Sequence, residues 1–438
     1  MQKALKLIEI KNVSKTFSRP DKPDLLVLDN ISINVFDGEI VAILGRSGSG
    51  KSTLLRIMAG LIPPSSGIVL FKNSEVTAPV RGLSMVFQTF ALMPWLTVLQ
   101  NVELGLEALG VPTKERNERA LKAIDMIGLD GFESAFPKEL SGGMQQRVGL
   151  ARALVVNPEV LLMDEAFSAL DVLTAENLRG DVMDLWHGHK TNIKAIVLVT
   201  HKIEEAIAMA DRVLLFDSSP GLIKAELPID LPHPRSTHDK RFVDLVARVY
   251  SILIAPTETE YTTELSTPHE EIDMDYRLPD IELTQLFGLI KAFETDFKDK
   301  KVSLNDLAAK QKQLSDDELS PLFVMLDILD ILHFARLSPG SIELTTTGHQ
   351  FANSDIQEKK QIFSQQLLLY VPLAAYIKRI LNENPNHTLK QEDIMELLES
   401  YFDKETAQQV FETIIDWGRY AEIFSYNADR KTLNLDNP

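Results

Sequence analysis

Eight consecutive residues near the N-terminus have the types and spacing needed to hold a phosphate. They are Gly45-Arg46-Ser47-Gly48-Ser49-Gly50-Lys51-Ser52, which fits the pattern G-x-x-x-x-G-K-[ST]. Glycines let the backbone turn closely enough to aim several N–H groups at phosphate oxygens. The lysine can reach the β and γ phosphates, and the last hydroxyl can hold Mg²⁺. A Gly- and Ser-rich turn could match by accident, so the flanking elements decide between the two readings.

Those flanking elements favour a true phosphate loop. Residues 39–44 form a short apolar run typical of a buried strand, and residues 52–58, with Thr53 in the first turn, are compatible with a helix. The positive N-terminal end of such a helix attracts the same phosphate charge. Upstream, residues 7–13 alternate as an edge strand would, and residues 25–35 are expected to pair with them as an antiparallel strand.

A second apolar run, Val160–Met163, ends in Asp164 and Glu165. Acids at the carboxyl end of a buried strand lie at the ligand-facing edge of an open α/β sheet. Asp164 would then bind Mg²⁺ directly or through its outer sphere, and Glu165 would orient the attacking water and accept its proton. An apolar strand that ends in Asp-Glu is common by itself, and the phosphate loop upstream is what makes the catalytic reading the better one.

Between these anchors, a hydroxyl and two glycines precede a helix expected over residues 144–155. The run is Leu140-Ser141-Gly142-Gly143-Met144-Gln145-Gln146-Arg147. With Ser141 at or near the cap, the helix start offers N–H groups and a dipole to a second anion. An ordinary Ser-Gly-Gly turn is the alternative.

Together with residues 168–171 and 199–201, these motifs occur in the order and spacing of an ABC-transporter ATPase subunit, which residues 5–230 resemble. The resemblance implies an α/β P-loop NTPase fold with an antiparallel β subdomain and a helical subdomain. It implies that Ser141 and Gly143 close on ATP held by a second copy in a homodimer, and that Asp171 joins the two sites. The implied ATP contacts are Phe17, on the adenine, and Gly45, Arg46, Ser47, Gly48, Ser49, Gly50, Lys51, Ser52, Thr53, Ser141, Gly142, Gly143, Gln145 and Asp171; Glu165, His201, Gln88 and Lys51 are the implied catalytic residues, and Ser52, Gln88 and Asp164 the Mg²⁺ ligands.

Some of these residues have structural alternatives. Phe17 could be a core aromatic at a strand end, His201 could cap a helix, and Gln88 could simply end a strand. The stretch Phe90–Val98 is apolar and aromatic for a surface loop, which is what docking to a membrane subunit would need. The resemblance therefore implies a permease partner near Gln88–Val98, and a solute-binding protein acting indirectly.

Composition sets further bounds. The chain has 438 residues, of which 45% are hydrophobic and 25% charged, enough for at least two cores. It contains no cysteine, which excludes disulfides and thiolate metal sites. The N-terminus lacks the apolar core of a signal peptide, and no transmembrane helix is expected. The resemblance, in turn, implies a peripheral location on the cytoplasmic face of a bacterial inner membrane.

The second half lies outside the ATPase pattern. We expect an ATPase domain over residues 1–240, a helix and polar linker over 241–279, and a mostly helical, winged-helix-like domain over 280–438 that resembles the AAA-associated C-terminal domain. Residues 231–438 carry 21 basic and 35 acidic residues, net −14, and a helix expected over 316–337 is strongly acidic. Such a domain would repel nucleic acid, so we expect a protein-contact unit that regulates turnover.

The resemblance extends to importers of nitrate, sulfonate, taurine and bicarbonate. The expected function is ATP hydrolysis, with ATP and Mg²⁺, that energises import of a small anion-type solute. The alternative is a soluble ABC-type ATP switch that acts on protein partners without transport. The solute itself is not readable, because membrane and binding subunits select it.

Overall fold

The computed structural model describes residues 5–19, 22–46, 48–168, 170–188, 191–217, 220–255, 274, 276–297, 301–314 and 319–435. The chain divides into two compact units, Met1–Val249 and Tyr250–Pro438. The division falls inside helix α7 (Lys240–Ile254). Residues 256–273, the main part of the expected polar linker, lie outside the described residues.

The first unit is built on a six-stranded sheet in the order β10-β9-β3-β8-β7-β6. Neighbouring strands pair in parallel except β9 and β10, which pair antiparallel. Because both faces of the central strands are covered, β3, β7 and β8 read as continuous apolar runs. The strands are β3 (Glu39–Gly45), β6 (Leu83–Val86), β7 (Val160–Asp164), β8 (Ala195–Thr200), β9 (Arg212–Asp217) and β10 (Leu222–Pro228).

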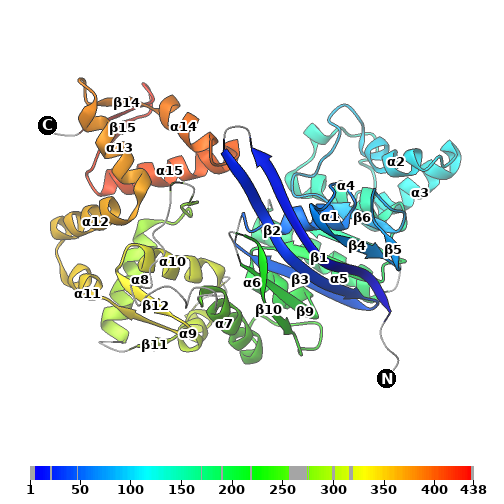
Figure 1. Ribbon diagram of the computed structural model, residues 1–438, viewed down its shortest axis with the longest axis horizontal. Coiled ribbons are helices and arrows are strands. Elements are labelled where there is room, and N and C mark those ends of the chain that lie inside the picture. The colour runs from blue at the N-terminus through cyan, green and yellow to red at the C-terminus, as the bar shows by residue number, and fades with distance from the viewer. Residues whose placement is uncertain are drawn as a thin grey trace. The chain divides into compact units, whose positions relative to one another are not determined.

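An antiparallel sheet in the order β2-β1-β4-β5 crosses the mixed sheet (Figure 1). The expected pairing of the first two strands is confirmed, but the expectation of an edge strand at residues 7–13 is wrong, because β1 lies between β2 and β4. Alternation reports that one face of a strand meets solvent and says nothing about its position in the sheet. The strands are β1 (Lys6–Arg19), β2 (Lys22–Phe36), β4 (Ser66–Phe71) and β5 (Ser74–Glu75).

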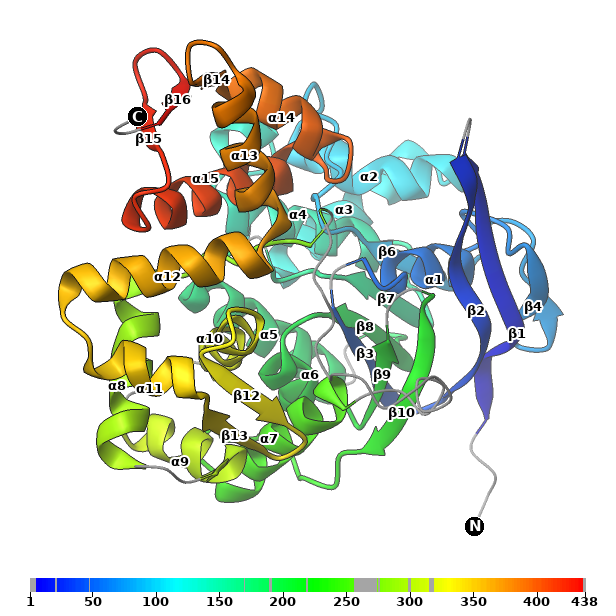
Figure 2. The same ribbon diagram turned by 60° about the vertical axis from the view of Figure 1, so that its left-hand side comes forward.

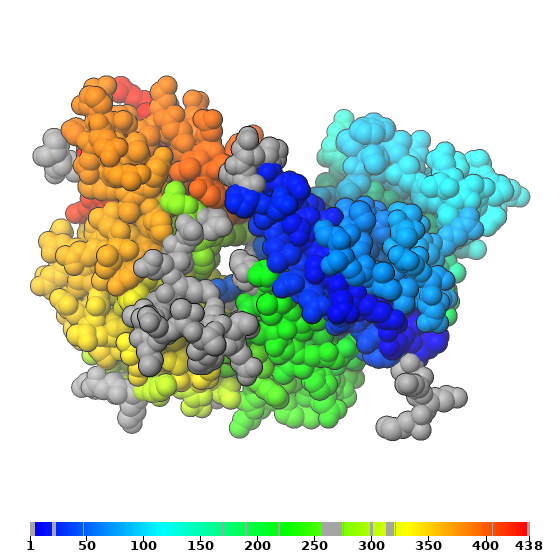
Figure 3. All heavy atoms as spheres, in the orientation of Figure 1, coloured from blue at the N-terminus to red at the C-terminus, as the bar shows by residue number. Residues whose placement is uncertain are grey.

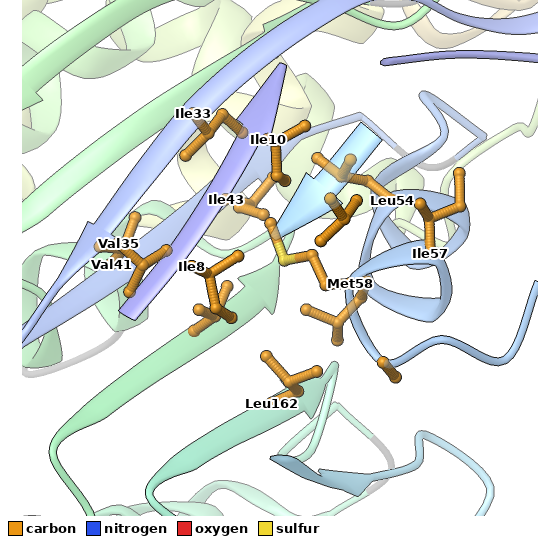
Figure 4. Close-up of a cluster of buried hydrophobic side chains, with 14 of the residues drawn as sticks. Ile8, Ile10, Ile33, Val35, Val41, Ile43, Leu54, Ile57, Met58 and Leu162 are labelled. Carbon is orange, nitrogen blue, oxygen red and sulfur yellow. The ribbon is translucent and has the colours of Figure 1, made fainter. Parts of the chain in front are cut away.

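The two sheets and helix α1 (Lys51–Met58) share one hydrophobic core. Figure 4 shows Leu54, Ile57 and Met58 of α1 among Ile8 of β1 and Ile43 of β3. All five side chains are 1% exposed or less, and burial of each contributes about 1.5–3 kcal/mol. This packing fixes α1 against the end of β3, which fixes the loop between them.

The helical subdomain that the resemblance implies lies between residues 98 and 154, and Figure 3 shows much of it as a cyan lobe beside the antiparallel sheet. It contains α2 (Val98–Ala108), α3 (Thr113–Met126), the short 3₁₀ turn η1 (Pro137–Glu139) and α4 (Gly142–Leu154). Thr97 and Gln100 form a capping box at the start of α2. Two further helices, α5 (Val172–His187) and α6 (Ile203–Met209), alternate with β7, β8 and β9.

The second unit contains two modules with the same element order of helix, strand, helix, helix and hairpin, in agreement with the mostly helical, winged-helix-like domain expected there. Each module forms a three-stranded sheet, ordered β11-β13-β12 and β14-β16-β15. Helix α12 contacts α11, α13 and α15 and so lies between the modules (Figure 2). The elements are α8 (Leu283–Asp296), β11 (Val302–Ser303), α9 (Leu304–Leu314), α10 (Ser320–Ile331), β12 (Ala335–Ser338), β13 (Ser341–Leu344), α11 (Thr346–Asn353), α12 (Ile356–Tyr370), α13 (Pro372–Glu383), β14 (Thr388–Lys390), α14 (Gln391–Glu399), α15 (Lys404–Tyr420), β15 (Ser425–Asn427) and β16 (Thr432–Asn434).

The acidic helix expected over residues 316–337 is wrong in its extent. Helix α10 ends at Ile331, and Arg336 lies in strand β12. His333 has a left-handed backbone with φ 56° and ends the helical run, which the apolar periodicity alone did not reveal. Residues 315–318 lie outside the described residues. Within the described parts of the chain, every helix is too short or too polar to cross a membrane.

One buried acid in the first unit stands out. Glu205, in α6, is 3% exposed, and its carboxyl accepts a hydrogen bond from the Thr200 hydroxyl at the end of β8. Burial raises the pKa of Glu205, and the Thr200 hydrogen bond opposes that shift. The folded protein therefore keeps a proton on Glu205 at pH values where the unfolded chain has released it.

We predict that Glu205→Gln changes the pH dependence of stability. Above the unfolded pKa the wild-type protein must take up a proton to fold, so its stability falls as pH rises toward the raised folded pKa. The amide does not titrate, so the variant should gain on wild type between pH 5 and pH 8. Each unit of raised pKa is worth about 1.4 kcal/mol.

Urea unfolding midpoints at both pH values measure this difference, with Glu176→Gln, an exposed carboxylate on α5, as the control. A wild-type to variant difference that is the same at both pH values would contradict the assignment.

Candidate functional site

The phosphate-loop motif lies where its chemistry requires, between the end of β3 and the start of α1. Gly48 and Gly50 have left-handed backbones, with φ of 82° and 87°. A Cβ on Gly50 would also lie 2.8 Å from the Leu28 side chain, and one on Gly45 would lie 2.7 Å from the carbonyl oxygen of Phe216. Each glycine is therefore needed for the loop's shape. Ser47 lies outside the described residues.

Lys51 points back into this loop. Its side chain is almost fully buried, and its Nζ donates to the carbonyl oxygens of Gly45 at 2.9 Å and Arg46 at 2.7 Å, with the Ser49 hydroxyl at 3.5 Å. Burial lowers the pKa of Lys51, while Glu165 and Asp164 act in the opposite direction. The ammonium is therefore held at the centre of the loop, where it can exchange carbonyl oxygens for phosphate oxygens.

Ser52 and Asp164 join the loop to β7. The Ser52 hydroxyl donates to Asp164 Oδ1 at 2.6 Å, and Asp164 is 2% exposed. Burial raises the pKa of Asp164, and the Ser52 hydrogen bond opposes this. A hydroxyl and a carboxylate are hard oxygen donors of the kind that Mg²⁺ takes from a protein when phosphates and water supply its other ligands. The pair fits Mg²⁺ in this sense.

Glu165, Gln88 and His201 come together at one point. The Gln88 amide donates to Glu165 Oε2 at 3.2 Å, and His201 Nδ1 lies 3.3 Å from the same oxygen. Sheet order explains the meeting, because these residues follow the carboxyl ends of the adjacent strands β6, β7 and β8. The Glu165 side chain is only 13% exposed, so the carboxylate is held rather than free in solvent.

The backbone of Glu165 has φ 45°, an unfavourable conformation for a residue with a side chain. Its N–H donates to the Val199 carbonyl oxygen of β8 at 3.0 Å, which fixes the peptide. Strain of this kind costs about 1–3 kcal/mol and concentrates at functional sites. The turn sends Asp164 toward Ser52 and Glu165 toward Gln88, so two consecutive acids serve different partners.

Phe17 lies on β1 with 40% of its surface exposed, and the Lys15 ammonium lies 5.0 Å from its ring centroid. It is therefore no core aromatic. The His201 side chain is 43% exposed and faces Glu165. It therefore does not cap a helix, which was the structural alternative.

The Ser-Gly-Gly motif begins α4 as expected. Ser141 is the N-cap, and its Oγ accepts the Met144 N–H at 3.3 Å. The Gln145 amide donates to the carbonyl oxygens of Pro137 and Leu140 and so stabilises the turn itself. Gly142 is the first residue of α4, and a Cβ there would meet no atom within 4 Å.

Asp171 caps α5, accepting the Thr174 N–H at 3.0 Å, and hydrogen bonding to Thr174 lowers the pKa of Asp171. A Cβ on Gly143 would lie 2.3 Å from Thr174 Cγ2, so the start of α4 packs directly on α5. No local pattern in the sequence marks Thr174, because its contact with Gly143 depends on how α4 approaches α5. The capping hydrogen bonds of Ser141 and Asp171 both lie within the first turns of their own helices.

Comparisons with known proteins identify the family of the chain. Residues 28–168 match the family described as ABC transporter, and residues 306–427 match the C-terminal AAA-associated domain. An uncharacterized ABC transporter ATP-binding protein of Methanocaldococcus jannaschii is 44% identical over 246 residues, 56% of this chain and 91% of the relative. A nitrate import ATP-binding protein of Synechocystis is 42% identical over 59% of this chain and 94% of its own length. An aliphatic sulfonates import ATP-binding protein of Bacillus cereus is 38% identical over 55% and 94%. The chain belongs to the ABC transporter ATP-binding proteins, and it carries a C-terminal AAA-associated domain.

Proposed function

We propose that this chain is the ATP-hydrolysing subunit that energises a membrane importer. The observation that carries the proposal is the Glu165 carboxylate, held by Gln88 and His201 beside the loop that contains Lys51. A carboxylate fixed next to a phosphate-binding loop is what hydrolysis of a γ-phosphate needs. The nitrate and sulfonate import relatives support an importer and do not favour the alternative of an ATP switch without transport.

In the proposed reaction, Lys51 and the loop N–H groups bind the β and γ phosphates, and Phe17 stacks on the adenine. Ser52 and Asp164, together with Gln88, would hold Mg²⁺, which would neutralise phosphate charge when bound. Glu165 orients a water and accepts its proton as the water oxygen bonds to the γ phosphorus. The bond to the bridging oxygen of ADP breaks, and His201 contacts the departing phosphate.

We further propose that the site is completed by a second copy of the chain. Ser141 and Gly143 lie at the start of α4, where the N–H groups of the first turn and the helix dipole suit an anion held by a second copy. Val172 and Leu173, directly after Asp171, are 58% and 71% exposed. Large apolar side chains at this position suit burial against a second copy.

The membrane partner is proposed to dock on the segment between Gln88 and Val98. Trp95 lies in a turn and is 70% exposed, and Met93 is 38% exposed. The chain would lie peripherally on the cytoplasmic face of a bacterial inner membrane and act with a solute-binding protein only indirectly. Import relatives named for nitrate, aliphatic sulfonates and taurine favour a small anion-type solute.

We propose that the ATPase domain comprises residues 1–240, the helix and linker residues 241–279, and the C-terminal domain residues 280–438. The last is proposed to regulate turnover through protein contacts, given its net charge of −14 over residues 231–438. Catalysis is assigned to the first unit, which contains Lys51, Asp164 and Glu165.

The first test is ATP hydrolysis by the purified chain with Glu165→Gln. The amide keeps the shape but cannot accept a proton, so kcat should fall at least about 100-fold. Light scattering in ATP and Mg²⁺ should show the variant trapped as a dimer. Glu176→Gln, an exposed site on α5, should behave as wild type. Unchanged hydrolysis in Glu165→Gln would remove its assigned role.

Docking is tested with inside-out membrane vesicles prepared from cells of the source organism that lack this chain. Wild type should bind them, and Trp95→Ala should bind at least about tenfold more weakly, since a buried tryptophan anchor is worth more than 1 kcal/mol. Ile356→Ala, at an equally exposed apolar site that is 75% exposed, is the control. Wild-type binding that Trp95→Ala does not weaken would place the docking surface elsewhere, and no binding by any form would favour the switch alternative.

A further inference from the structure

Two consecutive residues after Gln88 have strained backbones. Phe90 and Ala91 have φ of 42° and 48°, both in the left-handed region that residues with a Cβ avoid. Each such residue costs about 1–3 kcal/mol unless its surroundings fix it. No turn motif in the sequence calls for glycine-like geometry here, so another part of the molecule must hold these two peptides.

Arg152 of α4 is that part. Its Nη1 donates to the Ala91 carbonyl oxygen at 2.6 Å, and its Nη2 donates to the Phe90 carbonyl oxygen at 2.8 Å. The planar guanidinium fork matches two carbonyls that point the same way, and the left-handed turn is what makes them do so. Burial lowers the pKa of Arg152, and the two carbonyl oxygens replace part of the hydration that this partly buried guanidinium has lost.

A second residue, on α2, also holds this segment through hydrogen bonds. Asn101 of α2 is fully buried, and its amide both accepts the Met93 N–H at 2.8 Å and donates to the carbonyl oxygens of Met93, Leu96 and Thr97 at 3.0–3.1 Å. Gly149 lies one turn before Arg152, and a Cβ there would lie 3.5 Å from the Phe90 carbonyl oxygen. The segment from Phe90 to Thr97 therefore lies on α2 and α4, which contact each other.

Gln88, in contrast, is held by the mixed sheet. Its amide is bonded to Glu165, which the mixed sheet positions. Only Thr89 separates this sheet-bound residue from the first carbonyl that Arg152 holds. On this connection, any motion of the helical region relative to the sheet is taken up at about Thr89; the other connection runs from α4 to β7.

We propose that Arg152 is a positioning residue that makes the segment Phe90–Thr97 one rigid body with α4, the helix whose start carries Ser141 and Gly143. When α4 moves, the exposed Trp95 moves with it, and the strain between Gln88 and Phe90 changes the hold of Gln88 on Glu165. This role rests on the proposed function, because it describes how the hydrolytic site and the docking segment are coupled.

The test compares Arg152→Lys with Arg119→Lys in the full-length chain. Lysine keeps the charge but has one compact ammonium, which cannot hold two carbonyls in a fixed plane. Arg119 is the matched control, because its Nη2 donates at 2.9 Å to the Val155 carbonyl oxygen at the end of the same helix, away from the segment. A second variant, Ala91→Pro, breaks the contact from its other side, since proline fixes φ near −65° and Ala91 is exposed.

Amide hydrogen exchange is measured first, without nucleotide. Arg152→Lys and Ala91→Pro should each speed exchange of residues 90–98 at least about tenfold, while α2, α4 and Arg119→Lys stay as in wild type. In ATP hydrolysis, both variants should lower kcat several-fold and leave the KM for ATP within about twofold, because the phosphate loop is untouched.

The exchange result does not depend on hydrolysis, so it separates this proposal from the proposed function. Loss of all ATPase activity in wild type with the exchange pattern intact would overturn the proposed function and leave the fastening role of Arg152 standing. Exchange of residues 90–98 that stays at the wild-type rate, or that rises equally in Arg119→Lys, would overturn the role of Arg152.

Discussion

The buried ammonium of Lys51 is the constraint on which the rest of the site depends. Removing a charge from water costs several kcal/mol unless oxygens replace the lost hydration. The loop supplies those oxygens from the carbonyls of Gly45 and Arg46, which face inward only because glycines permit the turn. The loop therefore keeps its shape around a positive charge, and the same charge and shape suit the phosphates of a nucleotide.

The order of strands in the mixed sheet brings the other site residues together. Residues far apart in the chain meet at Glu165 because β6, β7 and β8 are neighbours whose carboxyl ends share one edge. The left-handed turn at Glu165 then divides two consecutive acids between Ser52 and the pair Gln88 and His201. Packing of α1 between the two sheets holds the phosphate loop at the same edge. The chemistry is thus a consequence of topology as much as of motif.

The sequence predicts the parts whose residues must be particular types. The phosphate loop, the strand that ends in Asp164, the Ser141 cap and the mostly helical C-terminal domain follow from spacing and periodicity, because glycine, capping and burial leave local patterns. The position of β1 inside its sheet left no such pattern, since an inner strand with one wet face alternates as an edge strand does.

Contacts between elements that are distant in the chain also leave no pattern in the sequence. In the sequence, nothing distinguishes Arg152 from other arginines in helices. The strained backbone at Phe90 that Arg152 holds is a property of dihedral angles, which the sequence does not show. The packing of Thr174 on Gly143 depends on how α4 approaches α5. The end of α10 at Ile331 was missed because the apolar periodicity continues through the turn into β12. In each case the information lies in three-dimensional packing, which one sequence read alone does not contain.

Nucleotide binding tests the central claim most directly. Calorimetric titration of the purified chain with ATP, ADP and AMP, each with Mg²⁺, should show ATP and ADP binding and AMP binding at least about 100-fold more weakly, because Lys51 and the loop recognise the phosphates beyond the first. Lys51→Ala should abolish the preference. AMP binding as tight as ADP binding, or a full preference retained in Lys51→Ala, would show that this loop is not the nucleotide site.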